Sequence, residues 1–225
     1  MLAAVVFDMD GVLLNSEPLH LRAYQAVLGG RRVRLTAAEY ADQYLGFDDP
    51  VIFRRLSDDR GLSWTAGDID ELVRNKIDFY RRELERQPQL FPGAAACVAR
   101  FAAEVPLAIA SGALHEEIEL VLALTGLRRH FVALVGSDDT PRSKPAPDPY
   151  AEAVARLSAV VGHSLHLGYV VGIEDSLHGV ESIRSAGLRA VAVTNTYASR
   201  DLTRADLIVE TLDGLSLDAL RTLCE

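Results

Sequence analysis

Close to its amino end the chain reads Leu2-Ala3-Ala4-Val5-Val6-Phe7-Asp8-Met9-Asp10-Gly11, so that an apolar run stops abruptly at a carboxylate. A short apolar run without polar alternation is typical of a strand that is buried on both faces of a parallel sheet. We therefore predict a strand over residues 2–7 that carries Asp8 at its carboxyl end.

Runs of the same kind recur along the rest of the chain, and helical patterns separate them. The runs cover residues 106–110, 131–135, 169–173 and 188–193, and a weaker one covers 207–209. Strands that alternate with helices are typical of an α/β fold in which helices cover both faces of a parallel sheet. The sequence therefore predicts a doubly wound, Rossmann-like α/β core over residues 1–15 and 87–225.

Several helix boundaries of this core can be predicted from single residues. Residues 114–125 form an amphipathic pattern followed by Gly126, and residues 176–186 are followed by Gly187. Glycine in these places suits the positive φ that often ends a helix. Asp148 and Pro149 are expected to open a further helix as its N-cap and its first-turn proline.

Residues 16–86 contain helical patterns only, and they interrupt the alternation directly after the first strand. The patterns cover residues 17–28, 37–45, 50–58 and 68–85. Thr36 and Asp49 are expected N-caps, and Pro50 takes a first-turn position. We predict an all-helical cap domain inserted above the carboxyl ends of the strands, where open α/β sheets bind ligands.

The formal net charge of −9 is distributed unevenly along the chain. Residues 16–86 hold 12 Lys/Arg and 13 Asp/Glu, a net of −1, so the predicted core carries the remaining −8. An acidic surface repels phosphates, which disfavours nucleic acids and anionic membranes as partners. If the substrate is a phosphate, the protein must build a local cationic site against its own field.

The sequence predicts a soluble cytoplasmic protein. The apolar run at residues 2–7 is too short for a signal-peptide core and lacks a basic leader. No stretch approaches the roughly 20 apolar residues of a membrane span. Cys97 and Cys224 are expected to be reduced thiols, because neither lies near a second cysteine or a histidine at metal-ligand spacing.

Asp8 and Asp10 form the first candidate catalytic pair. Two carboxylates at positions i and i+2 of an extended chain point the same way, about 7 Å apart. That spacing can straddle a phosphorus atom, so that one carboxylate attacks while the other protonates the departing oxygen. Gly11 would allow a tight turn and a close backbone approach. The alternative is a loop with solvated aspartates.

Ser111 and Lys144 are candidate phosphate ligands. Ser111 ends the second strand of the predicted core, where a hydroxyl and free backbone N–H groups make an anion site. Lys144 lies in a proline-rich loop before a helix and would neutralise phosphate as a point cation. A plain helix N-cap and a solvated loop lysine are the respective alternatives.

Glu174 and Asp175 are the candidate metal ligands at the end of the strand predicted over residues 169–173. Consecutive carboxylates at a buried strand end are costly unless a cation meets them, and a hard divalent cation prefers oxygen ligands. We expect Asp175 to be the direct ligand and Glu174 a second ligand or an outer partner. A surface turn is the alternative.

A charge count indicates that these groups need a metal. Asp8, Asp10, Glu174 and Asp175 give −4 and Lys144 gives +1, so the site would carry −3 and repel a phosphate. One Mg²⁺ brings the sum to −1, and a protonated Asp10, ready to act as a general acid, brings it to zero.

Taken together, these motifs resemble those of the haloacid dehalogenase-like hydrolase superfamily, over nearly the whole chain. The matching segments are Phe7-Asp8-Met9-Asp10-Gly11-Val12-Leu13, Ser111-Gly112, Lys144-Pro145-Ala146-Pro147-Asp148 and Gly172-Ile173-Glu174-Asp175-Ser176. The helical insertion is similar to the cap of the phosphatase and β-phosphoglucomutase-like subgroup. An aspartate at position 10 argues against the dehalogenase branch, which needs no metal.

The resemblance implies a role for each matched residue. Asp8 would become an aspartyl-phosphate and Asp10 would be the acid/base. Asp8, the Asp10 carbonyl and Asp175 would bind Mg²⁺. The phosphoryl oxygens would be held by Ser111, the Gly112 amide and Lys144.

We therefore expect a magnesium-dependent phosphatase of a small phosphorylated metabolite, such as a sugar phosphate. A sugar phosphomutase is the alternative, but mutase relatives carry an arginine in the cap loop, three residues after a glycine, where this chain has Asp49 after Gly46. A remote alternative is a non-catalytic phospho-acceptor resembling a response-regulator receiver, which has about half this length and no cap. Weaker candidates for substrate contacts in the cap are Glu17, His20, Phe47, Arg54 and Lys76.

Overall fold

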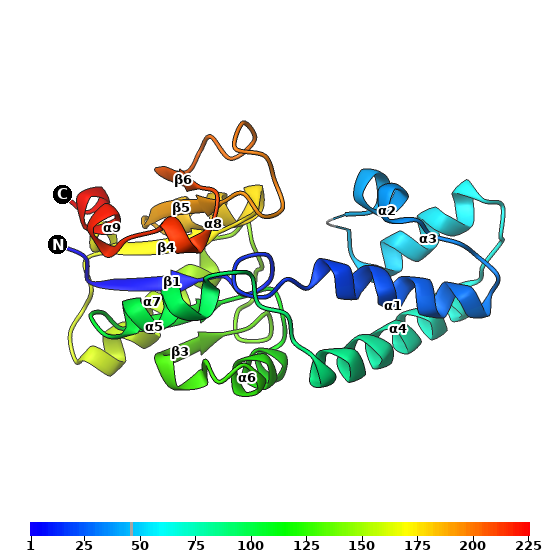
Figure 1. Ribbon diagram of the computed structural model, residues 1–225, viewed down its shortest axis with the longest axis horizontal. Helices are drawn as coiled ribbons and strands as arrows, with labels where there is room; N and C mark the ends of the chain where they lie inside the picture. The colour runs from blue at the N-terminus through cyan, green and yellow to red at the C-terminus, as the bar shows by residue number, and fades with distance from the viewer. Residues whose placement is uncertain (46) are drawn as a thin grey trace. The chain divides into compact units, whose positions relative to one another are not determined.

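The computed structural model describes residues 1–45 and 47–225 and divides the chain into two compact units. One unit combines residues 1–15 with 88–225 and is an α/β structure, and the other covers residues 16–87 and is helical. Figure 1 shows the helical insertion leaving the chain after the first strand and returning before the second.

The α/β unit is built on one parallel sheet, which among the described residues has six strands in the order β3-β2-β1-β4-β5-β6. The strands are β1 (Ala4–Phe7), β2 (Leu107–Ala110), β3 (Phe131–Val135), β4 (Val170–Glu174), β5 (Arg189–Val193) and β6 (Leu207–Val209). This arrangement confirms the doubly wound α/β fold. The strand order reverses beside β1, where Phe7 pairs with Ile109 on one side and Ile173 on the other.

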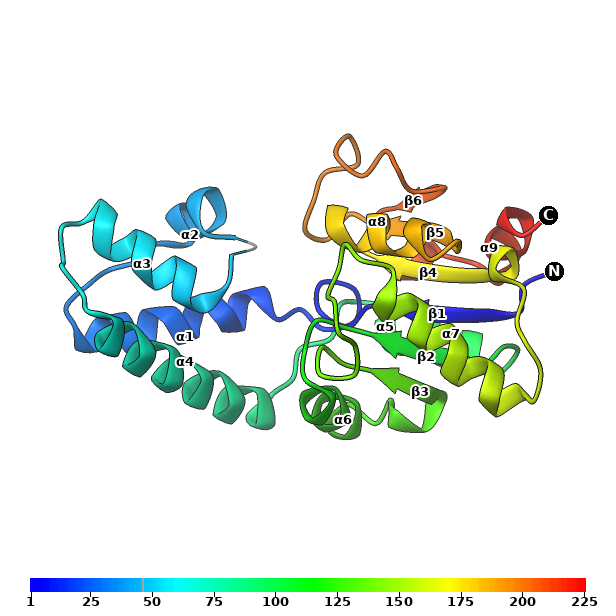
Figure 2. The same ribbon diagram turned by 180° about the vertical axis from the view of Figure 1, so that it is seen from behind.

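Alternating residues of β1 face two different layers of helices. On one face, Val6 belongs to a buried cluster with residues of α7 (Asp148–Val161) and α8 (Leu177–Ser185). On the other face, the ring of Phe7 lies 6.2 Å from that of Phe101 in α5 (Ala94–Ala102). Figures 1 and 2 show α5 and α7 on opposite sides of the sheet. Helices on both faces explain why β1 is apolar throughout.

The remaining helix of the α/β unit that the periodicity predicted is α6 (His115–Leu124). The periodicity did not predict α9 (Leu217–Leu223) or the 3₁₀ turns at Arg128–His130, Leu167–Tyr169 and Leu212–Gly214. Gly126 and Gly187 have the predicted positive φ, at 72° and 80°. The N-cap prediction for Asp148 was wrong by one residue, because Pro147 is the N-cap and Asp148 already belongs to the helix.

The helical unit consists of α1 (Glu17–Gly30), α2 (Ala37–Gln43), α3 (Asp49–Asp59) and α4 (Ala66–Arg86). Thr36 is an N-cap as predicted, and it shares a capping box with Glu39. The N-cap prediction for Asp49 was wrong by one residue. Asp48 has the extended N-cap conformation, and Asp49 and Pro50 lie in the first turn of the helix. Gly46, in the loop before α3, lies outside the described residues.

An aromatic core holds the helical unit together. Tyr24 and Phe53 are buried, with ring centroids 5.5 Å apart, and the ring of Trp64 lies 6.4 Å from that of Phe53. Because the chain has a single tryptophan, Trp64 fluorescence reports specifically on this unit. Over the part of the chain that the structure describes, no helix has the length and apolar composition needed to span a membrane.

The capping box at the start of α4 gives a test of this local structure. The Thr65 hydroxyl accepts from the Asp68 amide at 3.2 Å, and the Asp68 carboxylate accepts from the Thr65 amide at 3.0 Å. Thr65→Ala should lower the free energy of unfolding by about 1 kcal/mol. Urea denaturation followed by Trp64 fluorescence measures this loss. Thr65→Ser keeps the hydroxyl and should retain the stability; equal losses in both variants would contradict the capping role.

Candidate active site

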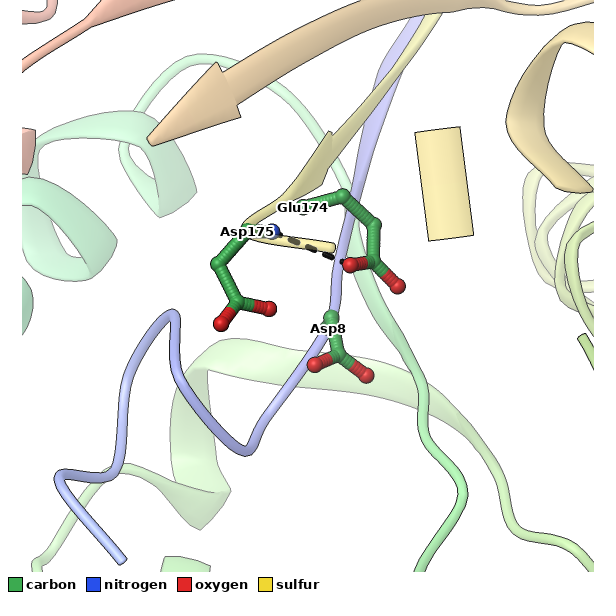
Figure 3. A group of neighbouring side chains, drawn as sticks. All are labelled: Asp8, Glu174 and Asp175. Atoms are coloured by element: carbon green, nitrogen blue, oxygen red, sulfur yellow. Dashed lines mark hydrogen bonds between the residues drawn. The ribbon is translucent and has the colours of Figure 1, made fainter. Parts of the chain in front are cut away.

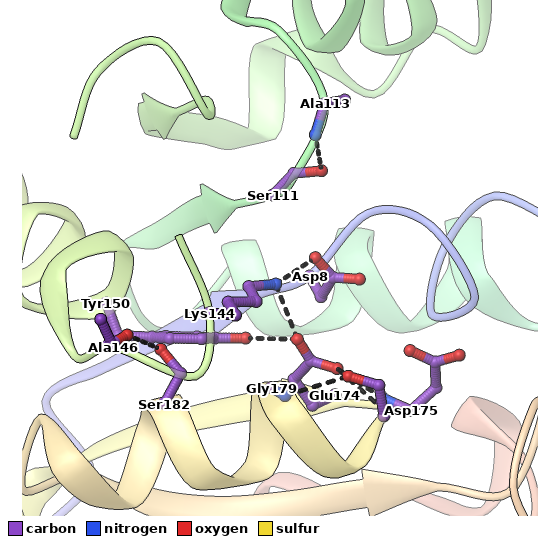
Figure 4. A network of polar contacts seen from close by, with 11 residues as sticks. Asp8, Ser111, Ala113, Lys144, Ala146, Tyr150, Glu174, Asp175, Gly179 and Ser182 are labelled. Carbon is purple, nitrogen blue, oxygen red and sulfur yellow. Dashed lines mark hydrogen bonds and ion pairs between the residues drawn. The ribbon is translucent and has the colours of Figure 1, made fainter. Parts of the chain in front are cut away.

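A buried ion-pair cluster lies where β1 and β4 end. Asp8 follows β1 and is 6 % exposed. Its amide donates to the Ile173 carbonyl at 2.9 Å. Lys144 Nζ lies 2.5 Å from Asp8 Oδ1 and 2.6 Å from Glu174 Oε1 (Figure 4). One ammonium therefore joins the ends of two neighbouring strands that are far apart in the sequence.

The Glu174 carboxylate is held by donors on both of its oxygens. Its Oε2 accepts from the Asp175 amide at 3.0 Å and from the amide and hydroxyl of Ser176 at 3.1 and 2.9 Å. Its Oε1 accepts from Lys144 and from the Tyr150 hydroxyl at 3.3 Å. Glu174 is therefore a fixed anion that orients Lys144.

The three neighbouring carboxylates respond differently to burial. Burial alone would raise the pKa of Glu174, but Lys144 and the hydrogen bonds from Ser176 hold it below its usual value. Burial raises the pKa of Asp8 well above its usual range despite Lys144, and nearby Glu174 and Asp175 add to the rise. Burial and then the charge of Glu174 raise the pKa of Asp175 to about 7. The single positive charge of Lys144 thus does not balance the three carboxylates.

The same three side chains form a set of oxygen donors that a metal ion could use. Asp8, Glu174 and Asp175 are buried, and one carboxylate oxygen of each lies within 4.8 Å of the others (Figure 3). With all three ionised and Lys144 protonated, the sum is −3 plus +1, or −2. A hard divalent cation with oxygen ligands fits both the donor set and the charge. Glu174, whose oxygens already accept several hydrogen bonds, suits an outer position.

The turn after Asp8 is closely fitted to Asp175. Gly11 has a φ of 79°, and a Cβ added to it would lie 1.9 Å from Asp175 Oδ2. Asp10, on the same turn, is partly exposed and adds to the raised pKa of Asp175. Only glycine at position 11 satisfies both the backbone conformation and the close approach.

Two site residues that the sequence analysis missed follow β5. Asn195 Nδ2 donates to the Gly11 carbonyl at 2.7 Å, and the Thr196 hydroxyl donates to Asp175 Oδ2. They hold the Asp10–Gly11 turn and the Asp175 carboxylate from the side of the neighbouring strand. The strand-end rule that selected Asp8 and Glu174, applied to the run at residues 188–193, points to the polar segment that follows it, which includes both.

Ser111 lies at the end of β2, next to β1 in the sheet (Figure 4). It is 2 % exposed, its amide donates to the Val135 carbonyl at 3.0 Å, and its hydroxyl accepts from the Ala113 amide at 3.1 Å. It does not cap α6, whose N-cap is Leu114. Gly112 is exposed, and a Cβ added there would meet no atom within 4 Å.

Two candidates of the helical unit meet in a second, partly buried cluster. Lys76 is 3 % exposed, and its Nζ lies 2.8 Å from His20 Nδ1 and 2.9 Å from Asp49 Oδ1. The His20 ring stacks on Tyr80 at 4.4 Å, and the Tyr24 hydroxyl also donates to Asp49. Asp49, which was predicted only as a helix cap and as the substitute for a mutase arginine, is thus the counter-ion of Lys76.

The other candidates of the helical unit stand apart from that ion pair. Glu17 accepts from the Tyr40 hydroxyl at 2.8 Å. Phe47 is 42 % exposed, with the Arg55 guanidinium 3.9 Å from its ring centroid. Arg54 is exposed and donates to the Pro50 carbonyl one turn earlier, at 3.2 Å. The structure gives Phe47 and Arg54 ordinary surface contacts within the helical unit.

The parallel sheet with its strand-end carboxylates and lysine defines a class of α/β hydrolases that carry an inserted helical unit. Residues 2–187 match the family model of the haloacid dehalogenase-like hydrolases, and the chain belongs to that family. It is a phosphatase of the family, a phosphoric monoester hydrolase. The family resemblance of the sequence motifs is thereby confirmed.

Named relatives match over most of their length. A phosphoglycolate phosphatase from Mesorhizobium japonicum is 26 % identical over 97 % of this chain and 95 % of its own. The fructose-1-phosphate phosphatase YqaB from Escherichia coli is 29 % identical over 85 % of this chain and 96 % of its own. The crystal structure of CbbY from Rhodobacter sphaeroides in complex with phosphate shares the fold, with a TM-score of 0.77, 24 % identity and coverage of 98 % and 100 %.

His20 gives the helical unit a predicted pH dependence. Burial and then the Lys76 ammonium lower the pKa of His20 from 6.5 to about 3. The unfolded chain therefore binds a proton that the folded state excludes, and stability that is complete above pH 6.5 falls as the pH drops toward 3. Urea denaturation followed by Trp64 fluorescence, above pH 6.5 and between pH 3 and 6.5, measures the loss.

A substitution at position 20 separates this effect from general acid denaturation. His20→Gln should flatten the pH dependence in this window, because glutamine does not titrate. The matched control is His163→Gln, at an exposed histidine of the α/β unit, which should keep the parent dependence. An unchanged pH dependence in His20→Gln would refute the assignment.

Proposed function

We propose that this phosphatase is magnesium-dependent and hydrolyses a small phosphorylated metabolite, such as a sugar phosphate, through an aspartyl-phosphate on Asp8. The observation that carries the proposal is the buried Asp8 carboxylate, 2.5 Å from Lys144 Nζ and within 4.8 Å of the donor oxygens of Glu174 and Asp175. A carboxylate flanked by a cation and by a metal-binding donor set is suited to attack an anionic phosphate.

The residues present fit a bound Mg²⁺. Asp8 and Asp175 would hold it directly, with the Asp10 carbonyl as a third ligand by analogy with the family, and Glu174 would support them. When bound, the ion supplies the positive charge that the cluster lacks and stabilises the charge of the transferring phosphoryl group. Thr196 would keep Asp175 oriented through its hydrogen bond.

The chain's own residues account for both steps of hydrolysis. Asp8 attacks the substrate phosphorus, the bond between phosphorus and the alkoxide oxygen breaks, and Asp10 donates a proton to that oxygen. Asp10 then takes a proton from water, whose oxygen attacks the phosphorus of the acyl phosphate and releases Asp8. The Ser111 hydroxyl, the Gly112 amide and Lys144 hold the phosphoryl oxygens.

The proposed substrate class draws on the relatives and on the charge of this chain. The named relatives include phosphatases of phosphoglycolate and of fructose 1-phosphate, both small metabolites. The net charge of −9 disfavours nucleic acids as substrates. One lysine and one metal ion would balance the negative charge of the carboxylates, so that a single phosphate group would no longer be repelled.

Asp49 favours hydrolysis over the phosphomutase alternative. A mutase must hold a second phosphate, and the mutases of the family carry an arginine at this place in the loop. Here the place is taken by a carboxylate that pairs with Lys76 at 2.9 Å. The Lys76 charge is therefore already balanced within the helical unit, which leaves it poorly suited to bind a second phosphate.

Asp8→Asn tests the nucleophile. Asparagine has nearly the same shape but cannot form the acyl phosphate, so kcat should fall at least about 1,000-fold. Release of inorganic phosphate from a panel of phosphorylated metabolites measures turnover. Asp218→Asn, at an exposed residue of α9, is the matched control and should retain parent activity. Sustained metal-dependent turnover by Asp8→Asn would refute the proposal.

Removal of divalent cations tests the metal. A chelator should abolish turnover, and added Mg²⁺ should restore it, because the cluster otherwise repels the substrate. Mg²⁺ should also raise the thermal unfolding temperature of the parent, since a ligand that binds only the folded state stabilises it. In Asp175→Asn this rise should be smaller. Full activity of thoroughly chelated protein would contradict the metal requirement.

A further inference from the structure

Tyr150 lies against the ion pair, in the first turn of α7, and no motif predicted a role for it. The residue is fully buried, at 0 % exposure. Its hydroxyl donates to Glu174 Oε1 at 3.3 Å, and Lys144 Nζ lies 5.2 Å from its ring centroid (Figure 4). One side chain therefore contacts both members of the Lys144–Glu174 pair.

The Tyr150 hydroxyl completes the set of donors around Glu174. Backbone and side-chain donors of Asp175 and Ser176 hold Oε2, whereas Oε1 accepts only from Lys144 and Tyr150 among the described residues. Without the tyrosine, Oε1 would depend on the lysine alone. The ammonium would then be drawn toward Glu174, because a buried carboxylate keeps its remaining donor close.

The ring of Tyr150 also restricts the position of the Lys144 ammonium. A positive charge is attracted to the face of an aromatic ring at this distance, more strongly when water is excluded. The Lys144 side chain is 13 % exposed. The contacts with Asp8, Glu174 and the ring together give the flexible lysine one position.

The surroundings hold Tyr150 itself in place. It packs in the buried cluster with Ala108 and Ala110 of β2 and Val180 of α8. The Ser182 hydroxyl donates to the Ala146 carbonyl at 2.5 Å and ties the loop between Lys144 and α7 to α8. A rigid support for a flexible cation is what a binding site for a phosphate requires.

We propose that Tyr150 is a positioning residue for Lys144, which keeps the ammonium at Asp8, where the phosphate of the substrate would bind. The proposal rests on the proposed function, because it assigns Lys144 to the phosphate. It gives Tyr150 an effect on phosphate affinity that a tyrosine serving only the core would lack.

Tyr150→Phe is the main test, because phenylalanine keeps the ring and removes only the hydroxyl. With Mg²⁺ and p-nitrophenyl phosphate, KM and the inhibition constant of inorganic phosphate should rise together by about 3- to 10-fold, while kcat changes less than about twofold. A merely structural defect would lower the active fraction, and so kcat, without changing either constant. That result, or unchanged constants, would overturn the proposal.

A more disruptive variant and a matched control complete the test. Tyr150→Leu also removes the ring and should raise both constants further. Tyr44→Phe is the matched control: Tyr44 is a buried tyrosine of the helical unit, and its hydroxyl donates to Asp59 at the same distance of 3.3 Å. Its constants should equal those of the parent. An equal effect of Tyr44→Phe would overturn the proposal.

Calorimetric binding of inorganic phosphate separates this inference from the proposed function. If the parent binds phosphate but hydrolyses no ester, the proposed function fails, while weaker phosphate binding by Tyr150→Phe still supports the positioning role. Equal binding by parent and variant overturns that role whether or not the parent is active. A parent that binds no phosphate overturns it too, because Lys144 would then have no phosphate to meet.

Discussion

The contact between the Lys144 ammonium and the carboxylates of Asp8 and Glu174 is the interaction on which the site depends. Burying charges is costly unless each has a partner, and here three buried carboxylates share one lysine. The hydrogen bonds to Glu174 and the Thr196 contact to Asp175 offset part of that cost. A bound divalent cation, as proposed above, would balance the negative charge that remains.

The sheet order makes this contact available to residues far apart in the sequence. Because β1 lies between β2 and β4, the residues that end or directly follow these strands reach one edge at the point where the strand order reverses. Asp8, Ser111 and Glu174 are the residues so placed. The helical unit interrupts the chain between the first two strands without disturbing their pairing, since Val6 still pairs with Ala108.

Much of the core was predictable because a buried parallel strand and the polar residue that ends it are both local signals. From these signals the sequence predicted the sheet and selected Asp8, Lys144, Glu174 and Asp175 as candidates for one site. It could not show that Tyr150 touches both Lys144 and Glu174, because a tyrosine in an apolar pattern indicates only core. Asp49 was mistaken for a cap because its partner, Lys76, lies in another helix.

Trapping the phosphorylated enzyme tests the central claim most directly. The protein would be mixed with Mg²⁺ and a ³²P-labelled substrate, quenched in acid within the first turnover, digested and mapped. We predict an acid-stable, hydroxylamine-labile label on the peptide that contains Asp8. Label on any other residue, or steady turnover without labelled protein at any quench time, would contradict the account.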